Sequence, residues 1–119
     1  MDQTMVKAWV EGYLQAWNSN DVEDIGRLFS EDAAYYTSPF QEPWRGREAI
    51  IQGWLGRKDE PGTFRFRYQV LATGDDLGVV RGWTQYLNPE REYSNIWVIR
   101  FDEQGRSTEF TEWWMKRKN

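Results

Sequence analysis

The sequence predicts an α+β protein in which helical segments come first and an antiparallel β-sheet follows. In residues 4–17 the apolar side chains recur at intervals of three and four, which is typical of an amphipathic helix. Residues 64–72 instead alternate between apolar and polar side chains, which is typical of a half-buried strand. The remaining chain reads as further strands separated by turns at residues 88–91 and 102–105, so the second half predicts consecutive β-hairpins.

The composition excludes several classes of function. The 119 residues predict one domain that spans residues 1–119. The net charge of −4 argues against nucleic-acid binding, which needs a basic face. The chain has no His and no Cys, so no metal or other cofactor is expected, and proton transfer must come from Asp, Glu, Tyr or Lys. No apolar run is long enough for a signal peptide or a membrane span, which predicts a cytoplasmic protein without a membrane partner.

The first predicted helix carries a stripe of aromatic residues. Trp9, Tyr13 and Trp17 recur every four residues on one face. Residues 18–20 end this helix, and Asp21 is expected to cap a short second helix. The side chains expected to point inward from this second segment are Val22, Ile25, Leu28 and Phe29.

The middle of the chain predicts a strand, a loop and a third helix. The strand is expected at residues 33–37, and the loop at residues 38–45 contains two prolines. The third helix follows Gly46. Its expected apolar residues are Ile50, Ile51, Trp54 and Leu55.

The turn at residues 102–105 predicts the register of the last hairpin. A four-residue turn that ends in glycine would pair Trp97 with Phe110 and Asn95 with Glu112. One polar pair would then lie among aromatic side chains on one face of the sheet.

The turn at residues 88–91 predicts the register of the hairpin before it. Four turn residues would pair Thr84 with Asn95 and Gly82 with Trp97. The glycine would then leave room for the indole ring of Trp97.

The two predicted registers agree on one face and predict a pocket that contains an acid. They align a polar row of Thr84, Asn95 and Glu112 between aromatic rows. Large aromatic side chains suit cavity walls because a few of them enclose much volume. The residues expected to line this ligand pocket are Trp17, Trp54, Thr84, Tyr93, Trp97, Phe110 and Trp114; the alternative for these aromatic residues is plain core.

The candidate catalytic residues are Glu112, Tyr13 and Asn95. Aromatic surroundings are expected to raise the pKa of Glu112, which suits a general acid or base near neutral pH. The alternatives are a carboxylate held structurally by Asn95 and Thr84, or one that faces solvent because the register slips. Tyr13 can donate a hydrogen bond to a ligand oxygen, or bond a neighbour within the core. Asn95 can orient Glu112 or a water molecule, or serve as a structural amide.

The opposite face of the sheet also carries large apolar residues, interrupted by one arginine. Its expected members are Val79, Arg81, Trp83, Ile96, Val98, Trp113 and Met115. A single-layer sheet has only one face covered by its own helices, so this second face predicts a homodimer.

Four segments, at residues 13–21, 28–33, 45–50 and 110–114, resemble SnoaL-like members of the nuclear transport factor 2-like superfamily. The order of the predicted elements is similar over essentially the whole chain. The resemblance implies a cystatin-like cone, in which a curved sheet wraps around the N-terminal helix and encloses a ligand pocket. Known members include ketosteroid isomerases, polyketide cyclases and limonene epoxide hydrolases, and also proteins without catalysis.

The resemblance also implies roles for individual residues. Tyr13 matches the oxyanion-stabilising tyrosine of ketosteroid isomerases, whereas their catalytic base falls near Thr37 or Ser38, which are not carboxylates, and their second acid on Trp97. Glu112 falls at the last-strand aspartate of limonene epoxide hydrolases. Tyr36 and Ser38 fall near the water-positioning residues of those hydrolases, which adds Tyr36 to the expected ligand-binding residues.

Two functions remain open from the sequence. The first is a cofactor-independent acid–base enzyme, of isomerase, cyclase or hydrolase type, that acts on an apolar, oxygen-bearing small molecule. The second is a non-catalytic ligand-binding or dimeric interaction domain of the same fold. A Glu112 that points into an open cavity with a raised pKa would favour the first, and a salt-bridged Glu112 in a filled core would favour the second.

Overall fold

A computed structural model describes residues 1–118, so Asn119, the last residue of the expected domain, lies outside the described part. The helices in the described chain are α1 (Gln3–Ser19), α2 (Val22–Gly26) and α3 (Arg47–Gly56). The strands are β1 (Phe29–Tyr36), β2 (Trp44–Arg45), β3 (Phe64–Thr73), β4 (Leu77–Leu87), β5 (Glu90–Phe101) and β6 (Ser107–Lys116). The predicted α+β class is confirmed.

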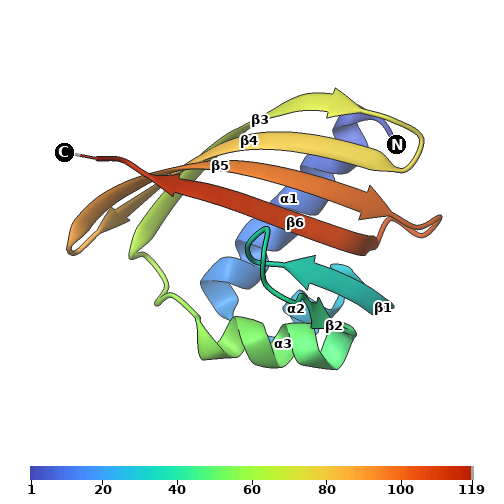
Figure 1. Ribbon diagram of the computed structural model, residues 1–119, viewed down its shortest axis with the longest axis horizontal. Helices are drawn as coiled ribbons and strands as arrows, with labels where there is room; N and C mark the ends of the chain where they lie inside the picture. The colour runs from blue at the N-terminus through green and yellow to red at the C-terminus, as the bar shows by residue number, and fades with distance from the viewer. Residues whose placement is uncertain (119) are drawn as a thin grey trace.

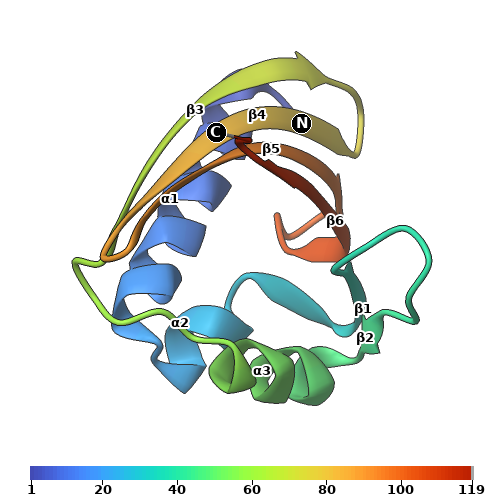
Figure 2. The ribbon, with the colours of Figure 1, turned by 60° about the vertical axis from the view of Figure 1, so that its left-hand side comes forward.

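The strands form one curved sheet in the order β2-β1-β6-β5-β4-β3. Neighbouring strands are antiparallel except β1 and β6, which run parallel. The sheet bends around α1 (Figures 1 and 2). Helix α3 lies on the opposite side of the interior from the strands that α1 covers. This arrangement is the cone that the resemblance implied. We call the side of the sheet that faces α1 the inner face and the other side the outer face.

Helix α1 is capped at both ends and lies closely against the sheet. The Asp2 carboxylate accepts a hydrogen bond from the Met5 backbone N–H (2.9 Å) at the start of the helix. Asn20 ends the helix in the left-handed conformation, with φ of 52°. The buried side chains of α1 are Val6, Trp9, Val10, Tyr13 and Ala16. Gly78 on β4 lets the helix approach, because an added Cβ would lie 2.9 Å from the Val6 side chain.

Helix α2 begins as predicted, at an aspartate cap. The Asp21 carboxylate accepts hydrogen bonds from the backbone N–H groups of Glu23 (2.8 Å) and Asp24 (3.3 Å). Of the four side chains expected to point inward, Ile25, Leu28 and Phe29 are buried. Val22 is 52% exposed, because α2 spans only five residues and can turn only part of its circumference towards the core.

The register between β5 and β6 differs from the prediction by two residues. Trp97 pairs with Glu112, not with Phe110. One extra residue enters at the turn, where the Asp102 carboxylate accepts hydrogen bonds from two backbone N–H groups (2.8 and 3.0 Å). The second extra residue is a bulge at Thr108.

The register between β4 and β5 also differs by two residues. The chain reverses through residues 88–89 alone, so Gly82 pairs with Asn95 and not with Trp97. The space above Gly82 is filled by the ring of Phe66, because an added Cβ would lie 2.4 Å from it. Phe66 in turn stacks on Trp97, with the ring centroids 5.0 Å apart.

Both register differences are even, so every side chain concerned keeps its predicted face. Thr84, Asn95 and Glu112 all point to the inner face, but as diagonal neighbours instead of direct partners. Diagonal neighbours in a sheet remain within reach of each other, and these three side chains are joined by hydrogen bonds.

Candidate active site

A cavity of about 350 Å³ opens between the inner face of the sheet, α1, α3 and the loop after α3. Its volume lies at the lower end of the range of roughly 300–1,000 Å³ for small-molecule sites. The buried side chains of Tyr13, Tyr35 and Trp54 line it. Exposed Trp114 and Arg57 also line it. The cavity therefore has an aromatic interior and a rim that is in contact with water.

Glu112 points into this cavity and is anchored through one carboxyl oxygen. Its Oε2 accepts hydrogen bonds from the Trp97 indole N–H (2.8 Å) and the Asn95 amide (3.3 Å). The Asn95 side-chain oxygen accepts a hydrogen bond from the Thr84 hydroxyl (2.8 Å), so the asparagine amide group is fixed with its N–H towards Glu112. Oε1 of Glu112 has no hydrogen-bond partner among residues 1–118. This second oxygen is therefore available to a ligand.

The surroundings of Glu112 favour its neutral form. Burial raises the pKa of the Glu112 carboxyl group, and the hydrogen bonds from Trp97 and Asn95 offset part of this rise. No salt bridge stabilises its charge within the described residues. A carboxyl group with a raised pKa can both release and accept a proton closer to neutral pH.

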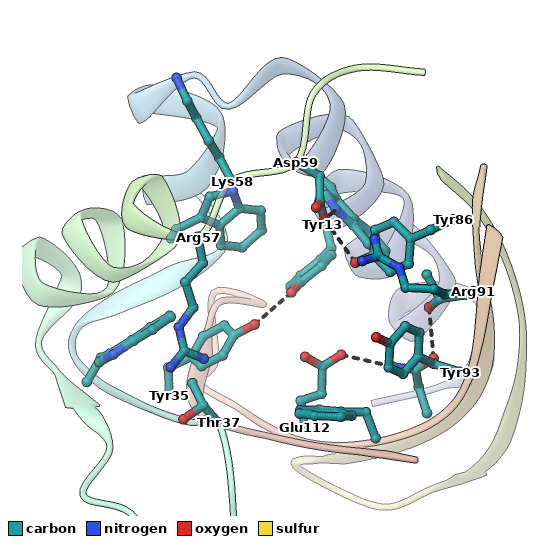
Figure 3. Close-up of a pocket in the computed structure, with 16 residues that line it drawn as sticks. Tyr13, Tyr35, Thr37, Arg57, Lys58, Asp59, Tyr86, Arg91, Tyr93 and Glu112 are labelled. Atoms are coloured by element: carbon teal, nitrogen blue, oxygen red, sulfur yellow. Dashed lines mark hydrogen bonds between the residues drawn. The ribbon is translucent and has the colours of Figure 1, made fainter. Parts of the chain in front are cut away.

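Two tyrosine hydroxyls lie opposite the carboxyl group. The hydroxyls of Tyr13 and Tyr35 are 2.7 Å apart and form a hydrogen bond in which either can donate. Figure 3 shows these hydroxyls and the Glu112 carboxyl group directed into the same space. Burial raises the pKa of both tyrosines well above the usual value, so at neutral pH they act as hydrogen-bond donors and not as bases.

Asp59 connects the loop after α3 to α1 and to β4. Its Oδ2 accepts hydrogen bonds from the Trp17 indole N–H (2.9 Å) and the Tyr86 hydroxyl (3.0 Å). The Asp59 backbone oxygen accepts a third hydrogen bond, from the Asn20 amide (2.9 Å). Burial, followed by the charge of Asp59, raises the pKa of Tyr86. These contacts fix one side of the cavity mouth.

The structure brings most of the expected site residues together. Those that line the cavity are Glu112, Tyr13, Asn95, Trp17, Trp54, Thr84, Tyr93 and Trp114. The three expected catalytic residues are among them. Their placement follows from the inner face of the sheet and from the aromatic stripe of α1.

Three expected ligand-binding residues do not line the cavity. Tyr36 pairs with Thr111 on the outer face, and its neighbour Tyr35 points inward instead. Phe110 is fully buried and Trp97 is 1% exposed, so both belong to the core behind the cavity wall. Trp97 contributes indirectly, as the donor that holds Glu112.

Several cavity residues were missed by the sequence analysis. Tyr35 is two residues from the buried Ala33, and strand alternation gives it the same face. Arg91 was assigned to a turn, but the shorter turn makes it a strand residue that lines the cavity. Arg57 and Asp59 lie on a loop, whose position depends on tertiary contacts that no local pattern reveals.

Replacing Glu112 with glutamine is expected to change the pH dependence of stability. The folded protein raises the pKa of Glu112, so the wild type loses stability as pH rises from the usual glutamate value, about 4.3, through the raised value. The Glu112→Gln variant carries no charge here and should be more stable than the wild type at neutral pH. Below the usual value the group is protonated in both states, so the difference should disappear. Urea unfolding of both proteins across pH measures this, and a difference that does not vary with pH would contradict the pKa assignment.

The described residues form neither a helix that could span a membrane nor an acidic cluster that could hold a metal ion. None of the helices formed by residues 1–118 is both long enough and apolar enough to cross a lipid bilayer. In the same residues, no three acidic side chains lie close enough together to hold a metal ion.

The fold is similar to several solved structures. An NTF-2-like protein of unknown function from Burkholderia xenovorans superposes with a TM-score of 0.77 at 15% identity, covering 98% of this chain and 88% of that chain. A putative ketosteroid isomerase from Kribbella flavida gives 0.74 at 17% identity, covering 98% and 82%. A ketosteroid isomerase-like protein from Erwinia carotovora gives 0.69 at 15% identity, covering 98% and 96%. At these identities the likeness concerns the fold.

The sequence itself matches a family model. No curated protein matches the chain significantly. The model described as the SnoaL-like domain matches residues 10–110, which include the helix with Tyr13 and the whole sheet as far as Phe110. The chain therefore belongs to the SnoaL-like domain family, and its fold is the nuclear transport factor 2-like cone.

Proposed function

We propose that the domain, residues 1–119, is a cofactor-independent enzyme that transfers a proton on a small, apolar molecule bearing an oxygen atom. The observation that carries this proposal is the placement of Glu112. Its Oε1 is unbonded within the described chain and faces the cavity, while its Oε2 is anchored by two donors. This is the arrangement expected of a general acid or base, since one oxygen is positioned and the other is free to react.

The two tyrosines complete the proposed chemistry. One hydroxyl of the Tyr13–Tyr35 pair donates to the other, so one proton remains for a substrate oxygen. When Glu112 removes a proton from the carbon next to a carbonyl group, negative charge develops on that oxygen. A buried, neutral hydroxyl that donates to this oxygen stabilises the charge in the transition state.

A ligand-binding domain without catalysis is the second candidate. A neutral Glu112 would donate a hydrogen bond to a ligand oxygen as readily as it would transfer a proton. The aromatic cavity serves both functions equally, so an assay must separate them.

Deuterium exchange tests proton transfer before a substrate is known. Small aryl ketones, with and without a carboxylate substituent, are incubated with the protein in deuterated water, and the loss of the α-proton signals is followed by NMR. We expect exchange that is faster with the wild type than with the Glu112→Gln variant. Binding of these ketones with equal exchange in both proteins would favour the ligand-binding domain.

We also propose a homodimer formed through the outer face. Trp113 and Met115 are 53% and 76% exposed there, beside Ile96 and Val98. Covering them would stabilise the dimer by about 25 cal/mol per Å² of apolar surface. Trp83 contributes less than expected, because two arginine side chains already cover its ring at 4.6 and 4.7 Å.

Sedimentation velocity tests the dimer. At micromolar concentration we expect a dimer that the Trp113→Glu variant converts to monomer, because a charge would be buried in the interface. The matched control is Phe40→Glu, since Phe40 is 99% exposed on the loop between β1 and β2. A monomeric wild type would exclude the proposed interface.

A further inference from the structure

The charges around the cavity point to the class of ligand, and we propose that the site binds an apolar acid whose carboxylate pairs with Arg57 and Arg91. This inference deepens the proposed function and rests on the proposal that the cavity binds a small molecule. It adds to the proposed function that the apolar ligand carries a carboxylate group.

Arg91 lines the cavity without an ionic partner. It lies on β5, two residues before Tyr93, and shares the inner face with it. Its guanidinium carbon lies 4.5 Å from the centre of the Tyr86 ring, so the group packs against an aromatic wall. Arg91 forms no salt bridge within residues 1–118, and its buried Nε has no hydrogen-bond acceptor there.

Arg57 reaches the cavity from the opposite side. It directly follows α3, and Figure 3 shows its guanidinium group beside Tyr35 and Thr37, across the cavity from Arg91. Its positive charge lowers the pKa of Tyr35 slightly against the larger effect of burial. Arg57 also forms no salt bridge in the described chain.

Neither acid of the cavity forms a salt bridge with these arginines in the described chain. Asp59 lies two residues after Arg57 on the same loop, yet its carboxylate is occupied by the neutral donors Trp17 and Tyr86. Glu112, the other acid of the cavity, is held by Trp97 and Asn95. The charges of Arg57 and Arg91 therefore remain available to a ligand in the cavity that both residues line.

The position of the arginines also orients the ligand. The interior offers the rings of Tyr13 and Trp54, which are almost fully buried, and the rim offers Trp114, which is 54% exposed. An apolar body would therefore fill the interior, with its reactive oxygen near Glu112 and its carboxylate towards the arginines. Guanidinium groups suit this task because they bind carboxylates through two parallel hydrogen bonds.

A pair of probes that differ only in charge tests this inference. Binding of 2-naphthoate and of 2-naphthamide is measured by calorimetry at neutral pH, where the first is an anion and the second is neutral. We expect the wild type to bind the acid about tenfold more tightly than the amide. The preference should weaken when ionic strength rises from about 0.01 to about 1 M, because salt screens partly exposed charges.

Arginine variants locate the effect. Arg57→Gln and Arg91→Gln should each reduce the preference for the acid, because the acid loses an ionic partner that the amide does not have. The control is Arg106→Gln, which removes the same charge from an exposed position in the β5–β6 turn and should leave the preference intact. An equal loss in the control would overturn the inference, because the effect would then come from net charge alone.

The failure of this inference can be distinguished from failure of the proposed function. Amide binding as tight as acid binding would overturn the anionic ligand, while exchange of neutral ketones would still support proton transfer by Glu112. Binding of neither probe at about millimolar concentration would overturn the inference as well. The Glu112→Gln variant is expected to lose exchange activity, so measuring its preference between acid and amide separates the two proposals.

Discussion

Replacing Glu112 with glutamine is expected to reduce turnover by about a hundredfold or more, the usual contribution of a general acid or base. The fold should be preserved, because the glutamine oxygen can accept the same hydrogen bonds from Trp97 and Asn95 that Oε2 accepts. Its amide N–H would then face the cavity, where it can donate to a ligand but cannot carry a proton. Steady-state kinetics on a substrate found by deuterium exchange measures this loss.

The Tyr13→Phe variant should cost less activity than Glu112→Gln. It removes one hydrogen-bond donor and no proton carrier, and Tyr35 remains beside the substrate oxygen. The matched control for the carboxylate is Glu109→Gln, because Glu109 is exposed on the same strand. Glu109 should take no part in catalysis. Wild-type turnover in the Glu112→Gln variant would show that the acid–base assignment is wrong.

Replacing Phe110 with alanine is expected to lower the free energy of unfolding by about 3–5 kcal/mol, the usual cost of removing a buried aromatic ring. Phe110 is fully buried. Its ring centroid lies 4.7 Å from that of Tyr35, 5.2 Å from that of Trp97 and 5.6 Å from that of Trp9. The variant would leave a void between α1 and the sheet, beside β1. Urea unfolding followed by tryptophan fluorescence measures the change.

Trp114→Ala is the matched control on the same strand and face. Trp114 is 54% exposed and lines the cavity, so its loss should cost only about 1 kcal/mol or less while weakening ligand binding. Equal destabilisation by the two variants would contradict the division of β6 into core and cavity wall.

The fold could be predicted because its elements have clear periods. The aromatic stripe of α1, the Asp21 cap and the alternation in β3 each identify an element without reference to the rest of the chain. The strand registers could not be predicted, because they depend on turn lengths that differ from the expected four residues. The Asp102 carboxylate lengthens one turn by bonding backbone groups within it, which composition alone does not reveal.

Residues of the candidate site could be predicted where their position depends on the face of a strand. They were missed where their position depends on the path of a loop. Glu112 and Asn95 were placed in the cavity because an even register error does not change the face of a side chain. The resemblance points to Tyr36 and not to its neighbour Tyr35, because it does not distinguish adjacent residues. Arg57 and Asp59 reach the cavity from a loop whose path is set by contacts with α1 and β4.

The bulge at Thr108 places Glu112 on the inner face of the sheet. If Thr108 were paired regularly with Arg100, so that the ladder continued from Phe101 and Ser107 without a bulge, every later side chain of β6 would change faces. Trp113 would then enter the interior and Glu112 would face water. The bulge thus absorbs one residue of β6, and the face on which Glu112 lies depends on the bulge being kept.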